Sequence, residues 1–312
     1  MDANRTPGIE TGNATGSASG YEAGHTTGYA NSIAAGDGPA VRIFYRLFGQ
    51  PGATPVLIVH GLSFFSYDWI ATAARLATDR QVAALDMRGF GDSDWPGDYS
   101  LAAHAADIVA VLDHLGWKQA ILIGHSMGGR HCAVAAARHP ERCAALVLVD
   151  YTPENAPEGA ARVAKRTAST PDAFPSIDEA MRWSGLDPDS AQGAQKRPRF
   201  EAYLKPVPGG WMIKRDPHFR DQFRRQVETG ERHKLELDMW QVLGQIACPA
   251  LVIRGARSDM FVAAAAPKVL AANPHFRLVE VDAGHNVAGD NPDAFHAEVR
   301  RWLDTEPGSG PT

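Results

Sequence analysis

The sequence contains few cysteines and no long apolar run. Three of its 312 residues are cysteine, namely Cys132, Cys143 and Cys248. Their odd number and their spacing fit neither a disulfide framework nor a zinc site, so we expect a reducing cytoplasmic location and no metal. No apolar run approaches the ~18 residues that a membrane-spanning helix needs. The first residues also lack the apolar stretch of a secretory signal, so we expect no membrane partner.

The sequence also lacks a large excess of charge of either sign. It has 31 Lys and Arg against 36 Asp and Glu, which gives a formal net charge of −5. Such a balance provides no broad positive field, and a nucleic-acid partner is therefore not expected. A hydrophobic fraction of 44% is ordinary for a globular protein, which excludes disorder of the whole chain. A small-molecule partner is the better expectation.

Short aliphatic runs alternate with helical patterns along most of the chain. This alternation predicts an α/β fold, with a doubly wound and mostly parallel sheet whose strands are joined by helical crossovers. The expected strands are 41–47, 56–59, 82–85, 120–123, 145–149, 250–254 and 276–281. The expected helices are 67–76, 101–115, 127–138, 263–272 and 292–303.

The alternation fails in three places, which define the expected domain organisation. Residues 1–38 carry a glycine at every fourth position from Gly8 to Gly28, and we interpret them as a flexible tail, as we do residues 305–312. Residues 151–237 contain helical patches but no convincing buried strand. We expect this stretch to be a helical insertion that lies above the sheet as a lid. The core is then formed by residues 39–150 and 238–304.

The strongest local motif is an apolar strand that leads into Gly124-His125-Ser126-Met127-Gly128 and then into a helix of small residues. A serine between a strand and a helix, with glycines two residues before and after it, is typical of a nucleophile elbow. The glycines are needed because side chains there would collide with the neighbouring strand and helix. We therefore predict that Ser126 is a catalytic nucleophile.

A serine nucleophile needs a general base, and the base needs an acid that orients it. His285 follows the last expected strand and precedes the last helix, so the carboxyl edge of the sheet would present it. Asp259 lies just past the strand before that and is the predicted acid, in the chain order Ser126, Asp259, His285. Asp150 is the alternative acid, because it also ends a strand and can reach the same imidazole.

Acyl transfer also needs two backbone N–H groups that stabilise the developing oxyanion. Met127, directly after the nucleophile, is predicted to supply the first. The second is expected from the loop after the strand that ends at Val59, where Gly61 lets the backbone turn and the Leu62 amide face the site.

Taken together, these motifs resemble those of the α/β-hydrolase superfamily. The resemblance rests on His60-Gly61, the segment from Asp86 to Ser93, the elbow around Ser126, Asp259, and Ala283-Gly284-His285, and it spans roughly residues 40 to 304. It is closest to the capped branch of esterases, lactonases and carbon–carbon-bond hydrolases. Epoxide hydrolases and haloalkane dehalogenases of the superfamily carry aspartate at the elbow, so the resemblance implies neither activity here. It implies a hydrolase without a cofactor.

The predicted lid is more basic than the rest of the chain. It carries 15 Lys and Arg and 13 Asp and Glu, a local balance of +2. Its basic clusters are either solvated helix faces or a recognition site for an anionic substrate. For the second case the expected substrate-binding residues are Arg162, Arg166, Arg182 and Trp183.

The complete set of residues favours a serine hydrolase that cleaves a carboxylic ester or lactone through an acyl-enzyme on Ser126. One alternative is carbon–carbon-bond cleavage of an activated diketone by the same three residues. The other is a ligand-binding protein that keeps this fold with little turnover, since fold alone does not determine function.

Overall fold

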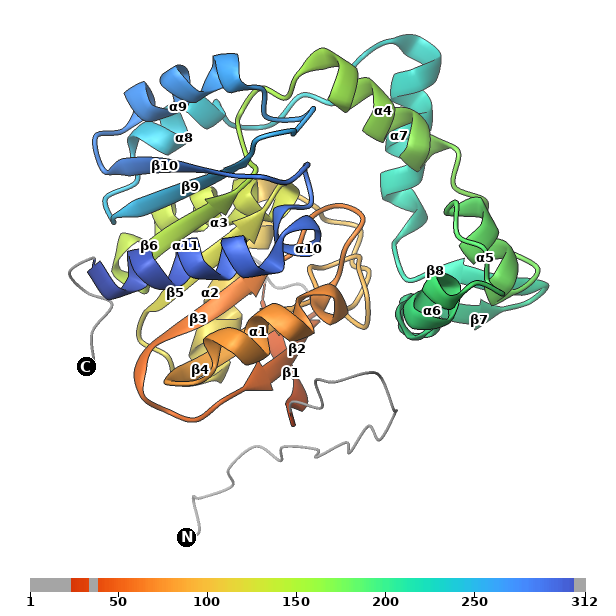
Figure 1. Cartoon of the computed structure of the whole chain (residues 1–312), viewed down its shortest axis with the longest axis horizontal. Coiled ribbons are helices and arrows are strands. Elements are labelled where there is room, and N and C mark those ends of the chain that lie inside the picture. Colours follow the sequence, from red (N-terminus) through yellow and green to blue (C-terminus); the bar gives the residue numbers. More distant parts are fainter. Residues whose placement is uncertain (1–23, 34–38, 306–312) are drawn as a thin grey trace, which may run out of the picture.

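The computed structural model of the chain describes residues 24–33 and 39–305, which form an eight-stranded sheet flanked by helices and a separate group of elements to one side (Figure 1). The strand order is β1-β2-β4-β3-β5-β6-β9-β10. The strands from β4 to β10 are parallel, whereas β1 and β2 are antiparallel to their neighbours. The strands are β1 Thr26–Ser32, β2 Val41–Phe48, β3 Ala53–Val59, β4 Arg80–Leu85, β5 Ala120–His125, β6 Cys143–Val149, β9 Ala250–Gly255 and β10 Phe276–Val281.

Helices cover both faces of this sheet. Alternate residues of a strand point to opposite faces, so Leu57 and Val59 pack against one helical layer and Val56 and Ile58 against the other. All four are buried, as expected for a parallel sheet covered on both sides. The first layer contains α2 Leu101–His114, α3 Met127–Arg138, α8 Met239–Gly244 and α9 Ala266–Ala272, and the second contains α1 Ile70–Leu76, α10 Val287–Asp290 and α11 Pro292–Thr305.

The predicted fold class is confirmed. Seven of the eight strands overlap the predicted strands, and β10 and α3 have the predicted bounds. The strands were recognisable because each is a short apolar run between turn residues. In a parallel sheet the carboxyl ends of the strands meet at one edge, and here β5, β6, β9 and β10 lie side by side in that order. The loops after these four strands therefore gather at one place.

The expectation that residues 1–38 are a flexible tail is wrong for the segment from Thr26 to Ser32. These residues form β1, which pairs antiparallel with β2 from Thr26 opposite Leu47 to Ser32 opposite Val41. The small side chains of this segment gave no apolar pattern from which a strand could be predicted. Small side chains fit this position in the sheet, however, because Ala30 and Ser32 are fully buried there. The remainder of the predicted tails, residues 1–23, 34–38 and 306–312, lies outside the described residues.

The insertion between β6 and α8 contains four helices and one hairpin. The helices are α4 Pro157–Ala168, α5 Ile177–Trp183, α6 Ala191–Tyr203 and α7 Pro217–Thr229, and the hairpin pairs β7 Leu204–Val207 with β8 Gly210–Ile213. We predicted helices alone, and the hairpin is a departure from that prediction. Its strands are only four residues long, and its turn depends on Gly209, whose φ of 85° suits glycine.

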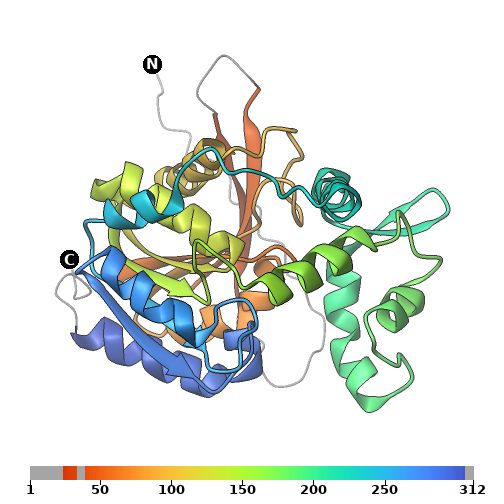
Figure 2. The ribbon, with the colours of Figure 1, turned by 90° about the horizontal axis from the view of Figure 1, so that it is seen from above.

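The insertion lies beside the carboxyl edge of the sheet, with α4 nearer the core and α5, α6 and the hairpin farther out (Figures 1 and 2). It is attached to the core by polar and aromatic contacts. Arg199 of α6 forms an ion pair with Asp68, and Lys214 forms one with Asp92. Tyr203 stacks on Phe65 with ring centroids 4.9 Å apart. Within residues 24–33 and 39–305, no helix is both long and apolar enough to cross a bilayer.

Candidate active site

Ser126 lies in a sharp turn between β5 and α3. Its backbone has φ 51° and ψ −115°, a conformation that a residue with a side chain rarely adopts. The surrounding backbone is packed too closely for other residues at two positions. A Cβ on Gly124 would lie 2.6 Å from the Gly128 carbonyl oxygen, and a Cβ on Gly128 would lie 2.3 Å from the Val59 carbonyl oxygen. The motif therefore folds locally as the strand–turn–helix that the sequence predicted.

Ser126 contacts the side chain of His285. The distance between Ser126 Oγ and His285 Nε2 is 3.0 Å. His285 follows β10, and its other ring nitrogen, Nδ1, lies 2.6 Å from Asp150 Oδ2. The hydroxyl, the imidazole and the carboxylate thus form one continuous hydrogen-bonded chain, with the side chains contributed by the ends of β5, β10 and β6.

Asp150 is held rigidly by three partners. It is 1% exposed. Its Oδ1 accepts from the backbone N–H of Gly255 at 2.8 Å, and its Oδ2 accepts from Ser258 Oγ at 2.5 Å as well as from His285. The residue has a φ of 46°, so the chain turns sharply directly after β6. A buried carboxylate with this many donors keeps a fixed orientation, which in turn fixes the imidazole.

The structure does not bring the predicted acid, Asp259, into contact with His285. Asp259 does not hydrogen-bond to His285, whose Nδ1 is occupied by the alternative residue, Asp150. Instead Asp259 is half exposed and accepts two hydrogen bonds from Arg162 of α4, at 2.7 and 2.8 Å. These hydrogen bonds lower the pKa of the Asp259 carboxyl. Asp150 directly follows β6, whereas Asp259 lies four residues beyond the end of β9 and is bound by Arg162.

The loop from β9 still contributes to this site, through a residue that sequence reasoning missed. Ser258 donates its hydroxyl to Asp150 and accepts from the backbone N–H groups of Met260 and Phe261, each at 3.1 Å. It therefore links the β6 end to the β9 loop. The available signal was a serine next to the predicted acid in a strand-end loop, where a hydroxyl can orient a buried carboxylate.

Leu62 and Met127, the predicted oxyanion donors, both line the cavity that contains Ser126 and His285. Met127 is the first residue of α3, so its N–H belongs to the free end of the helix. The loop with Leu62 is braced by His60, whose Nδ1 lies 2.8 Å from the Gly61 carbonyl oxygen and whose Nε2 accepts from Met87 N–H at 3.0 Å. Burial lowers the pKa of His60 to about 4, which keeps the ring neutral in this role.

The cavity around Ser126 has a volume of about 620 Å³, which is large enough for a small organic substrate. Its walls come from the core and from the insertion, including α4, α7 and the segment after α7. The charged residues that line it carry both signs: Arg130 and Arg232 are cationic, and Asp98, Glu154 and Glu236 are anionic. The lining of the cavity is therefore of mixed charge and is not predominantly positive.

Three other histidines near the cavity remain neutral. His104 and His131 stack with ring centroids 3.8 Å apart, and burial holds the pKa of both well below the usual range. Burial also lowers the pKa of His125 to about 3, and its Nε2 lies 2.9 Å from the His285 carbonyl oxygen. His285 hydrogen-bonds to Ser126 Oγ, which distinguishes this candidate base from the three buried histidines.

Arg130 is a second residue that sequence reasoning missed. It lies on α3 four residues after Ser126, hence on the same face of the helix, and it lines the cavity. Its Nε is buried without a hydrogen-bond partner, and among the described residues no carboxylate forms an ion pair with it. Burial lowers its pKa. The i to i+4 spacing from the predicted nucleophile was the signal available in the sequence.

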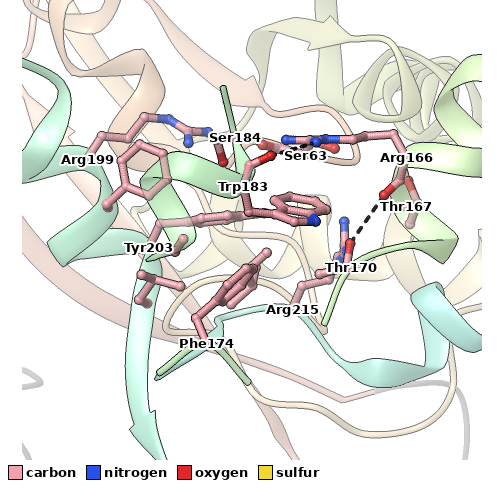
Figure 3. Close-up of a pocket in the computed structure, with 14 residues that line it drawn as sticks. Ser63, Arg166, Thr167, Thr170, Phe174, Trp183, Ser184, Arg199, Tyr203 and Arg215 are labelled. Carbon is pink, nitrogen blue, oxygen red and sulfur yellow. Dashed lines mark hydrogen bonds between the residues drawn. The ribbon is translucent and has the colours of Figure 1, made fainter. Parts of the chain in front are cut away.

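The four residues predicted to bind substrate from the lid do not line the cavity around Ser126. Arg162 is paired with Asp259, and Arg182 is paired with Glu179 on its own helix. Arg166 and Trp183 line a separate cavity within the insertion, which Figure 3 shows. The structure therefore brings none of the four predicted residues to the cavity around Ser126, and a role for them in substrate binding stays a prediction. Local charge alone did not reveal that carboxylates neutralise two of these arginines, one on the same helix and one in the loop after β9.

The described residues contain no group of three or more His, Cys, Asp or Glu side chains arranged to hold a metal ion. A hydroxyl hydrogen-bonded to an imidazole, which is hydrogen-bonded to a buried carboxylate, can transfer a proton from the hydroxyl as the oxygen attacks an electrophile.

Comparison with known proteins agrees with the observed fold. Residues 54–292 match the family model described as the alpha/beta hydrolase fold. A 3-hydroxybutyrate-oligomer hydrolase of Cupriavidus necator is 29% identical over 78% of this chain and 87% of its own length. A 2-(acetamidomethylene)succinate hydrolase of Mesorhizobium japonicum is 28% identical over 82% of this chain and 90% of its own length.

Solved structures show the same architecture. The crystal structure of E-2-(acetamidomethylene)succinate hydrolase superposes with a TM-score of 0.75 at 25% identity, covering 90% of this chain and all of the other. An α/β hydrolase from Novosphingobium aromaticivorans superposes with a TM-score of 0.71 at 28% identity, covering 90% of this chain and 98% of the other. The chain belongs to the α/β-hydrolase family.

Proposed function

We propose that this protein is a serine hydrolase that cleaves a carboxylic ester or lactone through an acyl-enzyme on Ser126. The observation that carries the proposal is the hydrogen-bonded chain from Ser126 Oγ through His285 to Asp150, with distances of 3.0 and 2.6 Å. All three side chains belong to rigid strand ends of the core. In this proposal the carboxylate that orients His285 is that of Asp150, not that of Asp259.

The proposed reaction follows from these contacts. His285 Nε2 takes the proton of Ser126 as Oγ attacks the carbonyl carbon, and Asp150 stabilises the imidazolium that forms. The amides of Leu62 and Met127 hold the oxyanion of the tetrahedral intermediate. The imidazolium then gives its proton to the leaving alcohol. A water molecule, deprotonated by His285, attacks the acyl-enzyme, and collapse of the second intermediate releases the acid and restores the serine.

The relatives support this class of reaction. They include a 3-hydroxybutyrate-oligomer hydrolase, a lipase of Mycobacterium tuberculosis and a putative esterase/lipase of Haemophilus influenzae. Each of these matches covers more than four fifths of the relative's own length. A small ester is also consistent with a cavity of about 620 Å³.

The proposal is tested by covalent labelling of the purified protein. A fluorophosphonate should add to Ser126 in a 1:1 ratio, located by peptide mass spectrometry, and labelling should remove p-nitrophenyl acetate hydrolysis in parallel. Heat-denatured protein is the control, since an intact triad is required for serine to react. An unlabelled Ser126 in folded protein, together with no ester turnover, would contradict the proposal and favour a ligand-binding role.

We further propose that the acyl group carries a neutral hydrogen-bond acceptor that Arg130 recognises. The guanidinium lies one helical turn beyond Ser126 and has no ion-pair partner among the described residues. Glu236, which forms no ion pair with another described residue, lines the same cavity and disfavours a strongly anionic substrate. A hydroxyl or second ester carbonyl on the acyl chain would satisfy Arg130 without that repulsion.

The preferred acyl group can be measured with a matched pair of p-nitrophenyl esters. The 3-hydroxybutyrate ester should have a kcat/KM about tenfold above that of the butyrate ester, because one hydrogen bond to a charged group contributes roughly 1.5 kcal/mol. Arg130→Met should abolish this preference while leaving butyrate turnover nearly unchanged. Arg138→Met, on the exposed end of the same helix, is the control. A preference that survives in the Arg130 variant would refute this assignment.

A further inference from the structure

A second cavity, which we name the lid cavity, lies within the insertion and is separate from the one around Ser126. Its volume is about 230 Å³, and its main walls are Arg166, Phe174, Trp183, Arg199, Tyr203 and Arg215 (Figure 3). Ser63 is the single residue that lines both cavities. The lid cavity is therefore a distinct compartment, formed mainly by α4, α5, α6 and β8 together with the segments that join them.

Three guanidinium groups line this cavity, and none of its lining residues is acidic. Arg199 is neutralised by Asp68, to which it donates from Nε at 2.5 Å and from Nη2 at 3.1 Å. Arg166 and Arg215 form no ion pair with any described residue. Two positive charges thus face a small space without a protein anion to balance them.

The positive charge of Arg215 is buried and has no anionic partner among the described residues, which is energetically unfavourable. Arg215 is 6% exposed, and its one described side-chain hydrogen bond goes to a neutral group, Thr170 Oγ1, at 3.1 Å. Burial lowers the pKa of Arg215. Another cation, Arg220, also lowers the pKa of Arg215. A buried charge is normally paired, so an anion in the cavity would complete its environment.

The aromatic walls specify the kind of anion. Arg166 lies over the indole ring of Trp183, with its Cζ 3.5 Å from the ring centroid, and donates to the Trp183 carbonyl oxygen at 3.0 Å. Phe174 packs edge-on against Trp183, with centroids 5.6 Å apart. Flat apolar surfaces suit a planar ring, and planar guanidinium groups suit a carboxylate, to which they donate in pairs.

We infer that the lid cavity is a binding site for a small aromatic carboxylate, such as a single ring that bears one carboxylate group. The carboxylate would lie between the guanidinium groups of Arg166 and Arg215, and the ring against Trp183 and Phe174. The volume of about 230 Å³ restricts the ligand to this size. The site is independent of Ser126, so it does not depend on the proposed hydrolytic activity.

Benzoate is the probe for the lid cavity, and calorimetric titration of the full chain at low salt is the measurement. Benzoate should bind at millimolar or lower concentration, and neutral benzamide should bind about tenfold more weakly, since it lacks the charge. Arg166→Met should weaken benzoate binding by about the same factor. Arg166 is exposed, so this variant is expected to fold. Arg215→Lys, which keeps the charge but loses the planar donor pair, should weaken binding by a smaller factor.

Two controls separate the lid cavity from the catalytic one. Arg182→Met removes an exposed lid arginine that does not line the cavity, and benzoate affinity should stay within about twofold of the parent. Protein labelled at Ser126 by a fluorophosphonate, or Ser126→Ala if labelling fails, should bind benzoate unchanged. Equal affinities for benzoate and benzamide, unaltered binding in Arg166→Met, or binding lost on modification of Ser126 would each overturn the assignment.

Discussion

Replacing Ser126 with alanine should lower kcat for ester hydrolysis by about 10⁴- to 10⁶-fold, which is the largest effect we expect from any single change. The loss follows because the alanine side chain offers no oxygen to form the acyl-enzyme. The residual rate would come from the oxyanion donors and from substrate binding. Steady-state kinetics with p-nitrophenyl acetate measure the change, and circular dichroism verifies that the variant is folded.

The same experiment tests whether Ser126 and His285 act as one unit. His285→Ala should cost a factor similar to that of Ser126→Ala, and the double variant should be little worse than either single one. Ser169→Ala, at an exposed position after α4, is the matched control and should retain full activity. Multiplicative losses in the double variant would show that the two residues contribute separately, contrary to the proposal.

The fold could be predicted from the sequence because the features that indicate it lie within short segments of the chain. Each strand of the parallel sheet is a short apolar run between turn residues, and the elbow around Ser126 contains its own glycines. His285 could be predicted for the same reason, since it directly follows a strand that is easily recognised. The segment Thr26–Ser32 was missed because it lacks the apolar alternation that predicts a strand, and it lies at the end of a stretch with a glycine at every fourth position. It becomes a strand by pairing with β2, which buries part of it.

The acid and the lid contacts depend on which elements become neighbours in space, and a single sequence does not contain that information directly. Asp150 and Asp259 both follow strands, so their local patterns are nearly equivalent. The two residues differ in their contacts in space: Gly255 and Ser258 hold Asp150 against His285, whereas Arg162 of α4 binds Asp259. Arg166 and Trp183, two of the four lid residues predicted to bind substrate, contact each other and line a different cavity from the one that contains Ser126.

Asp150→Asn should lower kcat by about 10⁴-fold, whereas Asp259→Asn should leave it within roughly tenfold of the parent. The amide can donate to His285 Nδ1 and so favours the tautomer whose Nε2 carries the proton and is unable to accept one from Ser126. Asp259 is half exposed and bound to Arg162, so its substitution removes a surface ion pair. Steady-state kinetics of the two variants, measured side by side, give the comparison.

The stability of both variants separates a loss of orientation from a loss of fold. Asp150 also accepts from Gly255 N–H and Ser258 Oγ, so Asp150→Asn disturbs two contacts outside the imidazole. Ser258→Ala removes one of these contacts while leaving the carboxylate on His285, and it should lower kcat much less than Asp150→Asn does. If Ser258→Ala and Asp150→Asn are equally inactive and equally destabilised, the carboxylate is structural. If Asp259→Asn is the more damaging variant, the acid is Asp259 after the substrate binds, and the contacts of the free protein do not represent the reacting state.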